Sequence, residues 1–312
     1  MKTLPQDHAL RLSRASQSLE GLSCGDAFGE RFFLPEPTLG SLLRERKIPA
    51  PPWFFTDDTM MAVAIVGTLQ ACGDINQDHL ASNFGRGYDP SRGYGLAMHG
   101  LLPKLRRDPA CWRHESAALF GGSGSFGNGS AMRVAPLGAY FADDLETLIG
   151  QAERSAVVTH SHSEAVAGAV AIAVAAALAT TEGAATPPRD FLNQILARVP
   201  RSAVRDGILR AIELGSEATV HQAVRILGNG TKVSAPDTVP FCLWAASRHL
   251  SDFEEAMWTT VSALGDRDTT CAIVGGIVAL SAGIESIPKA WLECREPLPP
   301  CHPKAQSPEP AA

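Results

Sequence analysis

Two acidic clusters, each placed just before a long apolar run, constrain this chain more than any other feature of its sequence. The first is 56–59, Thr-Asp-Asp-Thr, which precedes the apolar run 60–66, and the second is 265–270, which precedes the apolar run 271–280. Because adjacent aspartates repel one another, a fold that joins the two clusters needs cations between them. Ligand sets made only of oxygen suit Mg²⁺, Mn²⁺ or Ca²⁺ rather than zinc or copper.

The alternative explanation is that each cluster only caps a helix. Threonine and aspartate are common at helix N-termini, where they satisfy free N–H groups and suit the positive end of the dipole. One capping residue is enough for one helix, however, and Asp57 together with Asp58 exceeds that need. The same design recurs at Asp266 and Asp268. The repetition therefore favours a metal site over two separate caps.

The composition is typical of a soluble globular protein with a sizeable core, since 45% of the 312 residues are hydrophobic and 19% are charged. The net charge is −6 and no basic stripe is present, so a nucleic-acid partner is not expected. Seven cysteines without a Cys-x-x-Cys pair favour reduced thiols and a cytoplasmic location. The N-terminus has no signal-peptide core, and the run 165–179 predicts a buried core helix, not a membrane span.

The apolar periodicity predicts an all-α protein with a single domain, because sustained period-two alternation is absent from the sequence. A helix over residues 9–28 is expected to end in a tight turn at 25–29, Gly-Asp-Ala-Phe-Gly. The predicted domain covers residues 9–292, and the prolines that follow predict a flexible tail over 293–312. Further helices are expected over 59–72, 77–84, 96–105, 111–120, 143–157, 188–199, 201–214, 217–227, 236–250 and 252–264.

Two glycine-rich segments are candidates for contact with a ligand. Residues 121–130 precede a helix expected to begin near Ala131, and such an arrangement can bind an anion through backbone N–H groups. The segment is not a Walker loop, because no Gly-Lys-Ser/Thr follows, and a flexible connection is the alternative. The second segment, 85–95, is compatible with a substrate-lining loop or with a surface turn.

Two histidines, His160 and His162, precede the alanine-rich run, and Ser161 and Glu164 have the spacing of a capping box there. A zinc site is not favoured, because no third nitrogen or sulfur ligand has suitable spacing. We therefore expect one of the histidines to hold a neighbouring element or to contact substrate.

Five motifs, taken in order, give the chain a family resemblance. They are Gly25-Asp26-Ala27-x-Gly29, Thr56-Asp57-Asp58-Thr59, Gly127-Asn128-Gly129-x-x-Met132-Arg133-x-x-Pro136-Leu137-Gly138, Thr159-His160-x-His162 and Gly265-Asp266-x-Asp268-Thr269. The ordered set, which runs from Gly21 to Gly283, resembles the ADP-ribosylglycohydrolase family. That family includes the dinitrogenase-reductase-activating glycohydrolases.

The resemblance implies an orthogonal helical bundle with two metal ions, Mg²⁺ or Mn²⁺. It also implies hydrolysis of the bond that joins ADP-ribose to a protein side chain or to a small-molecule acceptor. The implied metal ligands are Thr56, Asp57, Asp58, Asp266, Asp268 and Thr269. The implied substrate-binding residues are Gly124, Ser125, Phe126, Gly127, Asn128, Gly129, Met132, Arg133, His160 and His162.

A carboxylate near the metal ions would take a proton from the attacking water. The candidates for this catalytic role are Asp57, Asp266 and Glu30. Family members often have a glutamate several residues after the Gly-Asp-Ala motif, but the matching position here is Phe33, with Glu30 and Glu36 the nearest carboxylates. Arg267 stands between two candidate ligands where a small residue is usual, and we expect its side chain to point away from them.

Two other functions stay open at this stage. A related hydrolase could act on a different ribosyl or phosphorylated small molecule. An ADP-ribose-binding or immunity-type protein could instead block a toxin or a modified target without catalysis. The intact acidic sets favour catalysis, and the sequence leaves open both the oligomeric state and the acceptor, which could be arginine, serine, a base or a metabolite.

Overall fold

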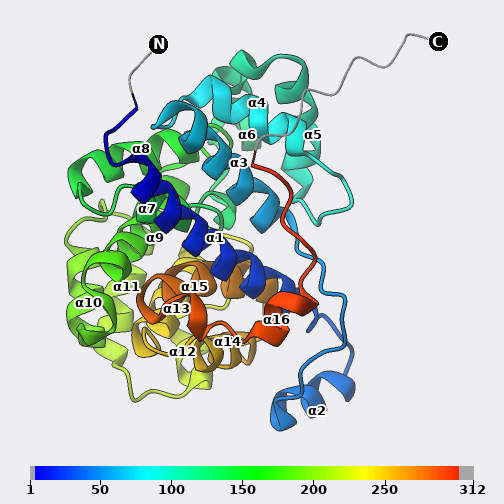
Figure 1. The fold of residues 1–312 in the computed structure, drawn as a ribbon, viewed down its shortest axis with the longest axis vertical. Helices are drawn as coiled ribbons and strands as arrows, with labels where there is room; N and C mark the ends of the chain where they lie inside the picture. The colour runs from blue at the N-terminus through cyan, green and yellow to red at the C-terminus, as the bar shows by residue number, and fades with distance from the viewer. Residues whose placement is uncertain (1–3, 302–312) are drawn as a thin grey trace.

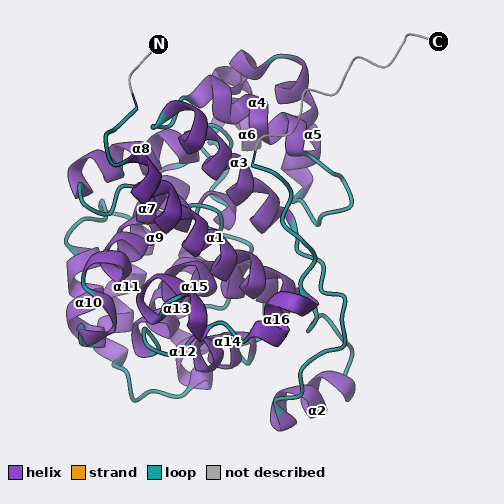
Figure 2. Cartoon of the chain, viewed as in Figure 1, coloured by secondary structure: helices purple, strands orange, loops and turns teal. Residues whose placement is uncertain are grey.

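The computed structural model describes residues 4–301, and every regular element within that range is a helix (Figures 1 and 2). The predicted all-α class is confirmed, because β-type pairing within residues 4–301 is confined to two isolated bridges, Trp53 with Arg295 and Gly127 with Ser234. The α-helices are α1 His8–Glu30, α2 Thr38–Glu45, α3 Asp57–Cys72, α4 Gln77–Gly87, α5 Leu96–Arg107, α6 Trp112–Gly122, α7 Ala135–Tyr140, α8 Leu145–Val157, α9 Ser163–Thr181, α10 Pro188–Leu196, α11 Ala203–Leu214, α12 Val220–Leu227, α13 Ala235–Arg248, α14 Phe253–Val261, α15 Arg267–Ala282 and α16 Lys289–Cys294. The short 3₁₀ helices are η1 Pro109–Cys111, η2 Asn128–Ser130, η3 Gly183–Ala185 and η4 Ile284–Ser286.

Helix α1 runs through the middle of the bundle and packs most extensively against α15 (Figure 1). Three glycines at four-residue spacing, Gly21, Gly25 and Gly29, face α15 at this crossing. A Cβ atom added at Gly25 would lie 2.1 Å from the carbonyl oxygen of Cys271. The two backbones are therefore in direct contact, which places the start of α15 beside the C-terminal half of α1.

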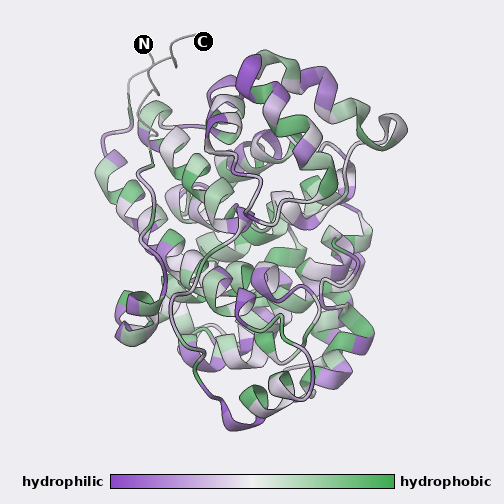
Figure 3. Cartoon of the chain, turned by 90° about the vertical axis from the view of Figure 1, so that its right-hand side faces the viewer, coloured by the Kyte–Doolittle hydropathy of each residue, from purple (hydrophilic) through white to green (hydrophobic). Residues whose placement is uncertain are grey.

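Helix α9 is a second buried helix of the bundle. It packs against α7, α8, α13 and α15. Among the described residues, α9 is the one helix that is long and apolar enough to cross a membrane. However, 78% of its most apolar 18-residue stretch is buried inside the protein. Green and pale ribbon predominates among the helices in the middle of Figure 3, while several outer loops are purple. The prediction of a buried core helix at 165–179 is confirmed.

Two local predictions near the glycine-rich motifs are wrong. Residues 25–29 are not a tight turn but the last turns of α1, because their glycines serve the close crossing with α15. The helix expected near Ala131 begins only at Ala135 as α7, after the 3₁₀ helix η2. The glycine-rich segment therefore leads into a short 3₁₀ helix and not directly into an α-helix N-terminus.

The expected capping box at the start of α9 is also wrong. The N-cap of α9 is His162, whose side chain accepts the Glu164 N–H at 3.1 Å. The Glu164 carboxylate instead accepts the N–H groups of Ala203 and Val204 at 2.8 and 3.0 Å. Glu164 thus caps α11, 39 residues further along the chain, and the local spacing gave no sign of this contact.

A flexible tail was predicted over residues 293–312. Its described part, which ends at Cys301, is held against the rest of the protein. The Trp53 N–H donates to the Cys294 carbonyl at 2.7 Å, and the Glu296 N–H donates to the Trp53 carbonyl at 2.9 Å. Leu298 and Cys301 pack against the core. These contacts fix the C-terminal segment, residues 295–301, along the chain that leads into α3 (red beside blue in Figure 1), and residues 302–312 lie outside the described range.

An aromatic cluster anchors the same region from inside. The Phe28 ring of α1 stacks on Trp291 of α16 at 4.5 Å between ring centroids and lies 5.7 Å from Trp53. All three side chains are buried. The cluster therefore joins α1 and α16 to Trp53, three residues before the first acidic cluster.

Candidate active site

The two acidic clusters lie together at the N-terminal ends of α3 and α15. Asp57 and Asp58 occupy the first turn of α3, Asp266 is the N-cap of α15, and Asp268 lies in the first turn of α15. The Thr269 hydroxyl lies 3.5 Å from Oδ2 of Asp58, a residue 211 positions away in the chain. Distant parts of the sequence thus form one acidic site.

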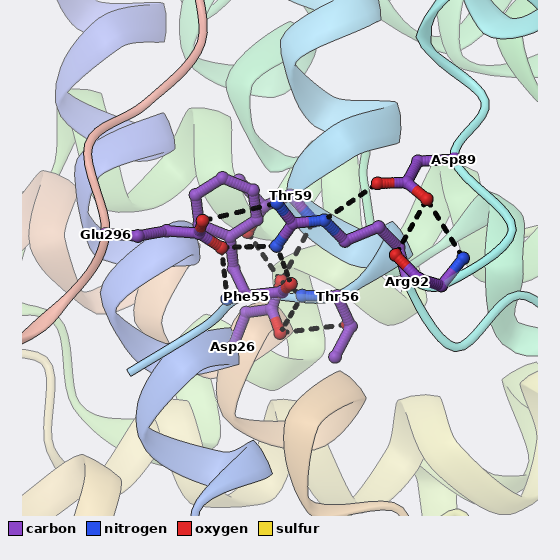
Figure 4. Close-up of polar contacts among 8 residues, drawn as sticks. Asp26, Phe55, Thr56, Thr59, Asp89, Arg92 and Glu296 are labelled. Atoms are coloured by element: carbon purple, nitrogen blue, oxygen red, sulfur yellow. Dashed lines mark hydrogen bonds and ion pairs between the residues drawn. The ribbon is translucent and has the colours of Figure 1, made fainter. Parts of the chain in front are cut away.

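Asp26 of α1 fixes the start of α3 within this site (Figure 4). Its Oδ1 accepts the Thr56 N–H at 3.0 Å, and its Oδ2 accepts the Thr59 N–H at 3.0 Å. The Thr59 hydroxyl donates to the same Oδ2 at 2.5 Å. Asp26 therefore supplies the capping bonds that the N-cap of α3, Thr56, does not supply itself. The sequence predicted only a turn residue here, although its Gly-Asp-Ala motif was part of the family resemblance.

Burial, followed by mutual repulsion, raises the pKa of the carboxyl groups in the site. Burial raises the pKa of Asp26 to about 6, and burial with repulsion from Asp268 raises that of Asp266 to about 7. Burial and the charge of Asp26 raise the pKa of Asp268 to about 6, and the pKa values of Asp57 and Asp58 also rise well above their ordinary range. Negative charge here costs free energy unless a cation compensates it.

The unpartnered oxygens of the site fit divalent cations. Oδ1 of Asp58 and Oδ1 of Asp268 are buried without a hydrogen-bond partner, which is costly for an ionised group. With the hydroxyls of Thr56 and Thr269, the donor set consists of oxygen alone, as Mg²⁺ and Mn²⁺ prefer. As the side chains stand, no three His, Cys, Asp or Glu residues within 4–301 are arranged to hold a metal ion.

A cavity of about 460 Å³ opens beside these carboxylates and is the candidate substrate pocket. Asp57, Asp266, Asp268 and Thr269 line its acidic end. The Asn128 side-chain amide donates to Oδ2 of Asp266 at 2.7 Å and so ties the glycine-rich segment to the acidic site. Seven of the predicted substrate-binding residues also line this pocket: Ser125, Phe126, Gly127, Asn128, Gly129, Met132 and His160.

Two further segments line the pocket. Gly93 and Gly95 belong to the glycine-rich segment 85–95, for which a substrate-lining loop and a surface turn were both open, and both residues face the pocket. Lys232 and Val233, from the loop before α13, were not singled out by any pattern in the sequence. Lys232 nevertheless brings positive charge to the rim of an otherwise acidic and apolar pocket.

Three predicted substrate-binding residues do not line the pocket. Gly124 has a positive φ of 73° and packs against Ser161, and His162 caps α9. Arg133 is fully buried: it donates to the Ser155 carbonyl and the Thr159 hydroxyl and lies 4.4 Å from the centre of the Phe84 ring. Burial lowers the pKa of Arg133 to about 9. Arg133 therefore does not line the pocket in this structure, and it contacts Met61, which does, at 3.5 Å.

A second cavity of about 460 Å³ adjoins the first, because Gly93 and Asp268 line both. Glu30 and Thr56 line this second cavity, and burial raises the pKa of Glu30. The Arg267 guanidinium lies over the Phe33 ring at 4.8 Å and donates to the Phe32 carbonyl. As expected, Arg267 is thus directed towards the end of α1.

The model of the ADP-ribosylglycohydrolase family matches residues 7–304 of the chain. The chain belongs to this family. ADP-ribosylhydrolase ARH3 of Homo sapiens is 29% identical over 92% of this chain and 90% of its own length. ADP-ribosylarginine hydrolase Tri1 of Pseudomonas putida is 26% identical over 93% of this chain and 76% of its own length. A solved structure titled ADP-ribosylglycohydrolase-related protein complex matches with a TM-score of 0.67 and 27% identity, over 92% of this chain and 93% of that one.

Members of the ADP-ribosylglycohydrolase family are hydrolases that act on ADP-ribosyl glycosidic bonds. The match of sequence and structure over nine-tenths of the chain confirms the predicted fold of this family type. Each of the five motifs contributes at least one residue to this site or to its support, namely Asp26, Asp57, Asn128, His160 and Asp266, whereas Arg133 and His162 do not line the pocket.

One side chain of this family member, His160, is held in a defined orientation at the pocket. Its Nδ1 lies 2.7 Å from the Thr159 hydroxyl, which accepts a hydrogen bond from Arg133 at 2.9 Å. Because an arginine only donates, the Thr159 hydroxyl keeps its own proton available for Nδ1, and we infer the tautomer that carries its proton on Nε2. Burial lowers the pKa of His160 to about 3. His160 is therefore a neutral imidazole that presents its Nε2–H beside Gly127 and Gly129.

Thr159→Val is expected to lower kcat/KM about tenfold, the effect of losing one hydrogen bond of roughly 1.4 kcal/mol. The valine cannot donate to Nδ1, so the His160 ring loses its fixed tautomer. Nitrogen NMR of the histidine ring reports the tautomer, and Thr159→Ser is the matched control that keeps the hydroxyl. Unchanged tautomer and unchanged kcat/KM in Thr159→Val would contradict this role.

Proposed function

We propose that this protein removes ADP-ribose from a modified acceptor by hydrolysing the glycosidic bond at the ribose anomeric carbon, with two divalent cations, Mg²⁺ or Mn²⁺. Thr56, Asp57 and Asp58 would hold the cations from α3, and Asp266, Asp268 and Thr269 would hold them from α15. The observation that carries the proposal is the pair of buried, unpartnered carboxylate oxygens, on Asp58 and Asp268, next to an open pocket.

The pocket offers groups suited to each part of ADP-ribose. The exposed ring of Phe126, with Leu96 and Met132, gives an apolar surface for a base or a ribose. Lys232 at the rim supplies a positive charge for the diphosphate, and His160 supplies a neutral N–H donor. Contacts far from the broken bond orient that bond, so binding energy is used to place the anomeric carbon at the acidic end.

When bound, the cations would lower the pKa of a water molecule and compensate the buried carboxylates. In the proposed reaction the oxygen of a water bonds to the anomeric carbon, the bond from that carbon to the acceptor breaks, and the acceptor leaves with a proton. Asp266 is engaged by Asn128, which favours Asp57 and Glu30 for handling the proton. Glu30 lines the second cavity, which adjoins the first at Asp268, and its raised pKa suits a group that both accepts and donates protons.

The test is a panel of ADP-ribosylated peptides and small molecules, each with a different linkage, incubated with protein and Mg²⁺ and analysed by mass spectrometry. We expect free ADP-ribose to be released from at least one linkage, and a chelator to stop the release. Equal release with and without the chelator would contradict cation dependence. No release from any linkage would favour an ADP-ribose-binding role without catalysis.

We also infer a cytoplasmic location. All seven cysteines are free thiols, four of them buried, which suits a reducing compartment. Fractionation of the native host cell would test this location.

Saturating Mg²⁺ is expected to raise the melting temperature more at pH 8 than at pH 5. The folded-state pKa values of Asp26, Asp266 and Asp268 are raised to between about 6 and about 7. Without metal, the folded state therefore keeps protons that the unfolded state has lost, and stability falls as pH rises from about 4 to about 7. Cations reverse this loss at high pH, where protons do not compete with them, and contribute about 2.7 kcal/mol at 100 times Kd. Thermal melts with Mg²⁺ or chelator at each pH make the comparison, and equal shifts at both would contradict it.

A further inference from the structure

Residues 53–56, which lead into α3, belong to no helix, and their pairing with other backbone is the isolated bridge between Trp53 and Arg295. Glu296, in the C-terminal segment, fixes these residues by hydrogen bonds. Its backbone N–H donates to the Trp53 carbonyl at 2.9 Å, and its Oε1 accepts the Phe55 N–H at 3.1 Å. Glu296, which is 241 positions from Phe55, thus contacts the loop 53–57 through both its main chain and its side chain.

Arg92, from the loop before α5, completes the same set of contacts (Figure 4). Its guanidinium pairs with both oxygens of Glu296, donates to the Phe55 carbonyl at 2.9 Å and lies 4.8 Å from the centre of the Phe55 ring. Its own carbonyl oxygen accepts the Asp57 N–H at 2.8 Å. Arg92 therefore touches the loop on both sides of Thr56.

These contacts and those of Asp26 satisfy the backbone of the loop almost completely. The Phe55 N–H donates to Glu296, and the Phe55 carbonyl accepts a hydrogen bond from Arg92. The Thr56 N–H donates to Asp26, and the Asp57 N–H donates to the Arg92 carbonyl. The Arg92 and Glu296 side chains are only 22% and 17% exposed, so solvent screens the pair weakly.

The pairing also matters for the charge of the site. The hydrogen bond to Glu296 raises the pKa of Arg92, and the Glu296 carboxylate balances the positive charge of the guanidinium. Arg92 lines the second cavity together with Asp268 and Glu30, where an unpaired guanidinium would compete with a cation for their carboxylates. With Glu296 in place, the carboxylates stay available.

We propose that Glu296 and Arg92 are positioning residues, which fix Thr56 and Asp57 for cation binding through the backbone of residues 55–57. This inference rests on the proposed cation site. It gives the C-terminal segment a role in the reaction, although none of its residues lines the substrate pocket.

Glu296→Ala is expected to weaken Mn²⁺ binding, measured by calorimetry without substrate, about 10- to 100-fold, the usual effect of losing a group behind a metal ligand. Glu296→Gln can still accept the Phe55 N–H but loses the charge pair, so we expect a smaller loss. The matched control is Glu20→Gln, which breaks the Arg295–Glu20 pair of the same segment, at 2.8 Å, but removes no bond to residues 55–57. The control is expected to lower the melting temperature but to leave Mn²⁺ affinity unchanged.

A second measurement needs no metal. In chelator-treated protein, hydrogen exchange at the amides of Phe55 and Asp57 is expected to be faster in Glu296→Ala than in wild type, and unchanged in Glu20→Gln. Unaltered Mn²⁺ affinity and exchange in Glu296→Ala would overturn the inference, as would an equal loss of affinity in both variants. Failure of the wild type itself to bind Mn²⁺ would instead overturn the cation site of the proposed function.

Discussion

Asp268→Asn is expected to lower kcat/KM at least about 100-fold while the protein remains folded. Asp268 lines both cavities, and its Oδ1 is buried without a partner. An amide oxygen cannot supply the negative charge that a divalent cation requires, and loss of a group merely behind a ligand already costs about 10- to 100-fold. Without metal, the variant is expected to melt at a higher temperature than wild type, because one of several buried like charges is gone. Steady-state kinetics and melts in chelator measure the two effects.

The control for this prediction is Asp252→Asn. Asp252 is the N-cap of α14 and accepts the Glu255 N–H at 3.0 Å, so it has the capping role that the alternative explanation gave to the acidic clusters. We expect this control to keep its activity and to lose at most about 1 kcal/mol of stability. If Asp268→Asn behaved in the same way, with normal Mn²⁺ affinity, the acidic clusters would be helix caps only.

The candidate ligands were predictable because their signal is local. Paired oxygen donors such as Asp57 and Asp58 stand directly before an apolar helix, and the excess over one cap is visible in the sequence. The residues that orient them were not predictable, because their roles depend on contacts across 30 to 241 residues, as for Asp26 and Glu296. A single sequence carries no mark of which distant carboxylate will accept the Thr56 or the Phe55 N–H.

The position of Arg133 was also not predictable, because it depends on contacts with residues distant in the sequence. The family resemblance implied that Arg133 is a substrate-binding residue. The fold instead buries it and compensates the cost with two oxygen acceptors and the face of an aromatic ring, Phe84. The helical class depended on apolar periodicity, which every helix repeats, and so it survived such local errors. The glycines of α1 did not reveal their role, because a glycine that permits a turn and a glycine that permits close helix packing look alike in sequence.

Gly25→Ala is accordingly expected to cost about 3 kcal/mol or more, since a rigid backbone atom and not a flexible side chain blocks the new methyl group. Its Cβ would lie 2.1 Å from the Cys271 carbonyl oxygen and 2.7 Å from the carbonyl carbon. Helices α1 and α15 would have to separate, which for a protein of 312 residues lowers the melting temperature by roughly 5 °C or more. The separation would also move Asp26, on α1, away from Asp268, on α15, so cation affinity is expected to fall as well.

The same substitution at Gly100 separates this steric effect from the ordinary preference of alanine for helix. Gly100 lies within α5, is exposed, and a Cβ there would meet no atom within 4 Å. Gly100→Ala is therefore expected to stabilise the protein by about 0.5–1 kcal/mol through helix propensity. Calorimetric melts of both variants, with and without Mn²⁺, test the contrast. If Gly25→Ala melted like Gly100→Ala, the α1–α15 contact would not be what sets the distance between Asp26 and the ligands of α15.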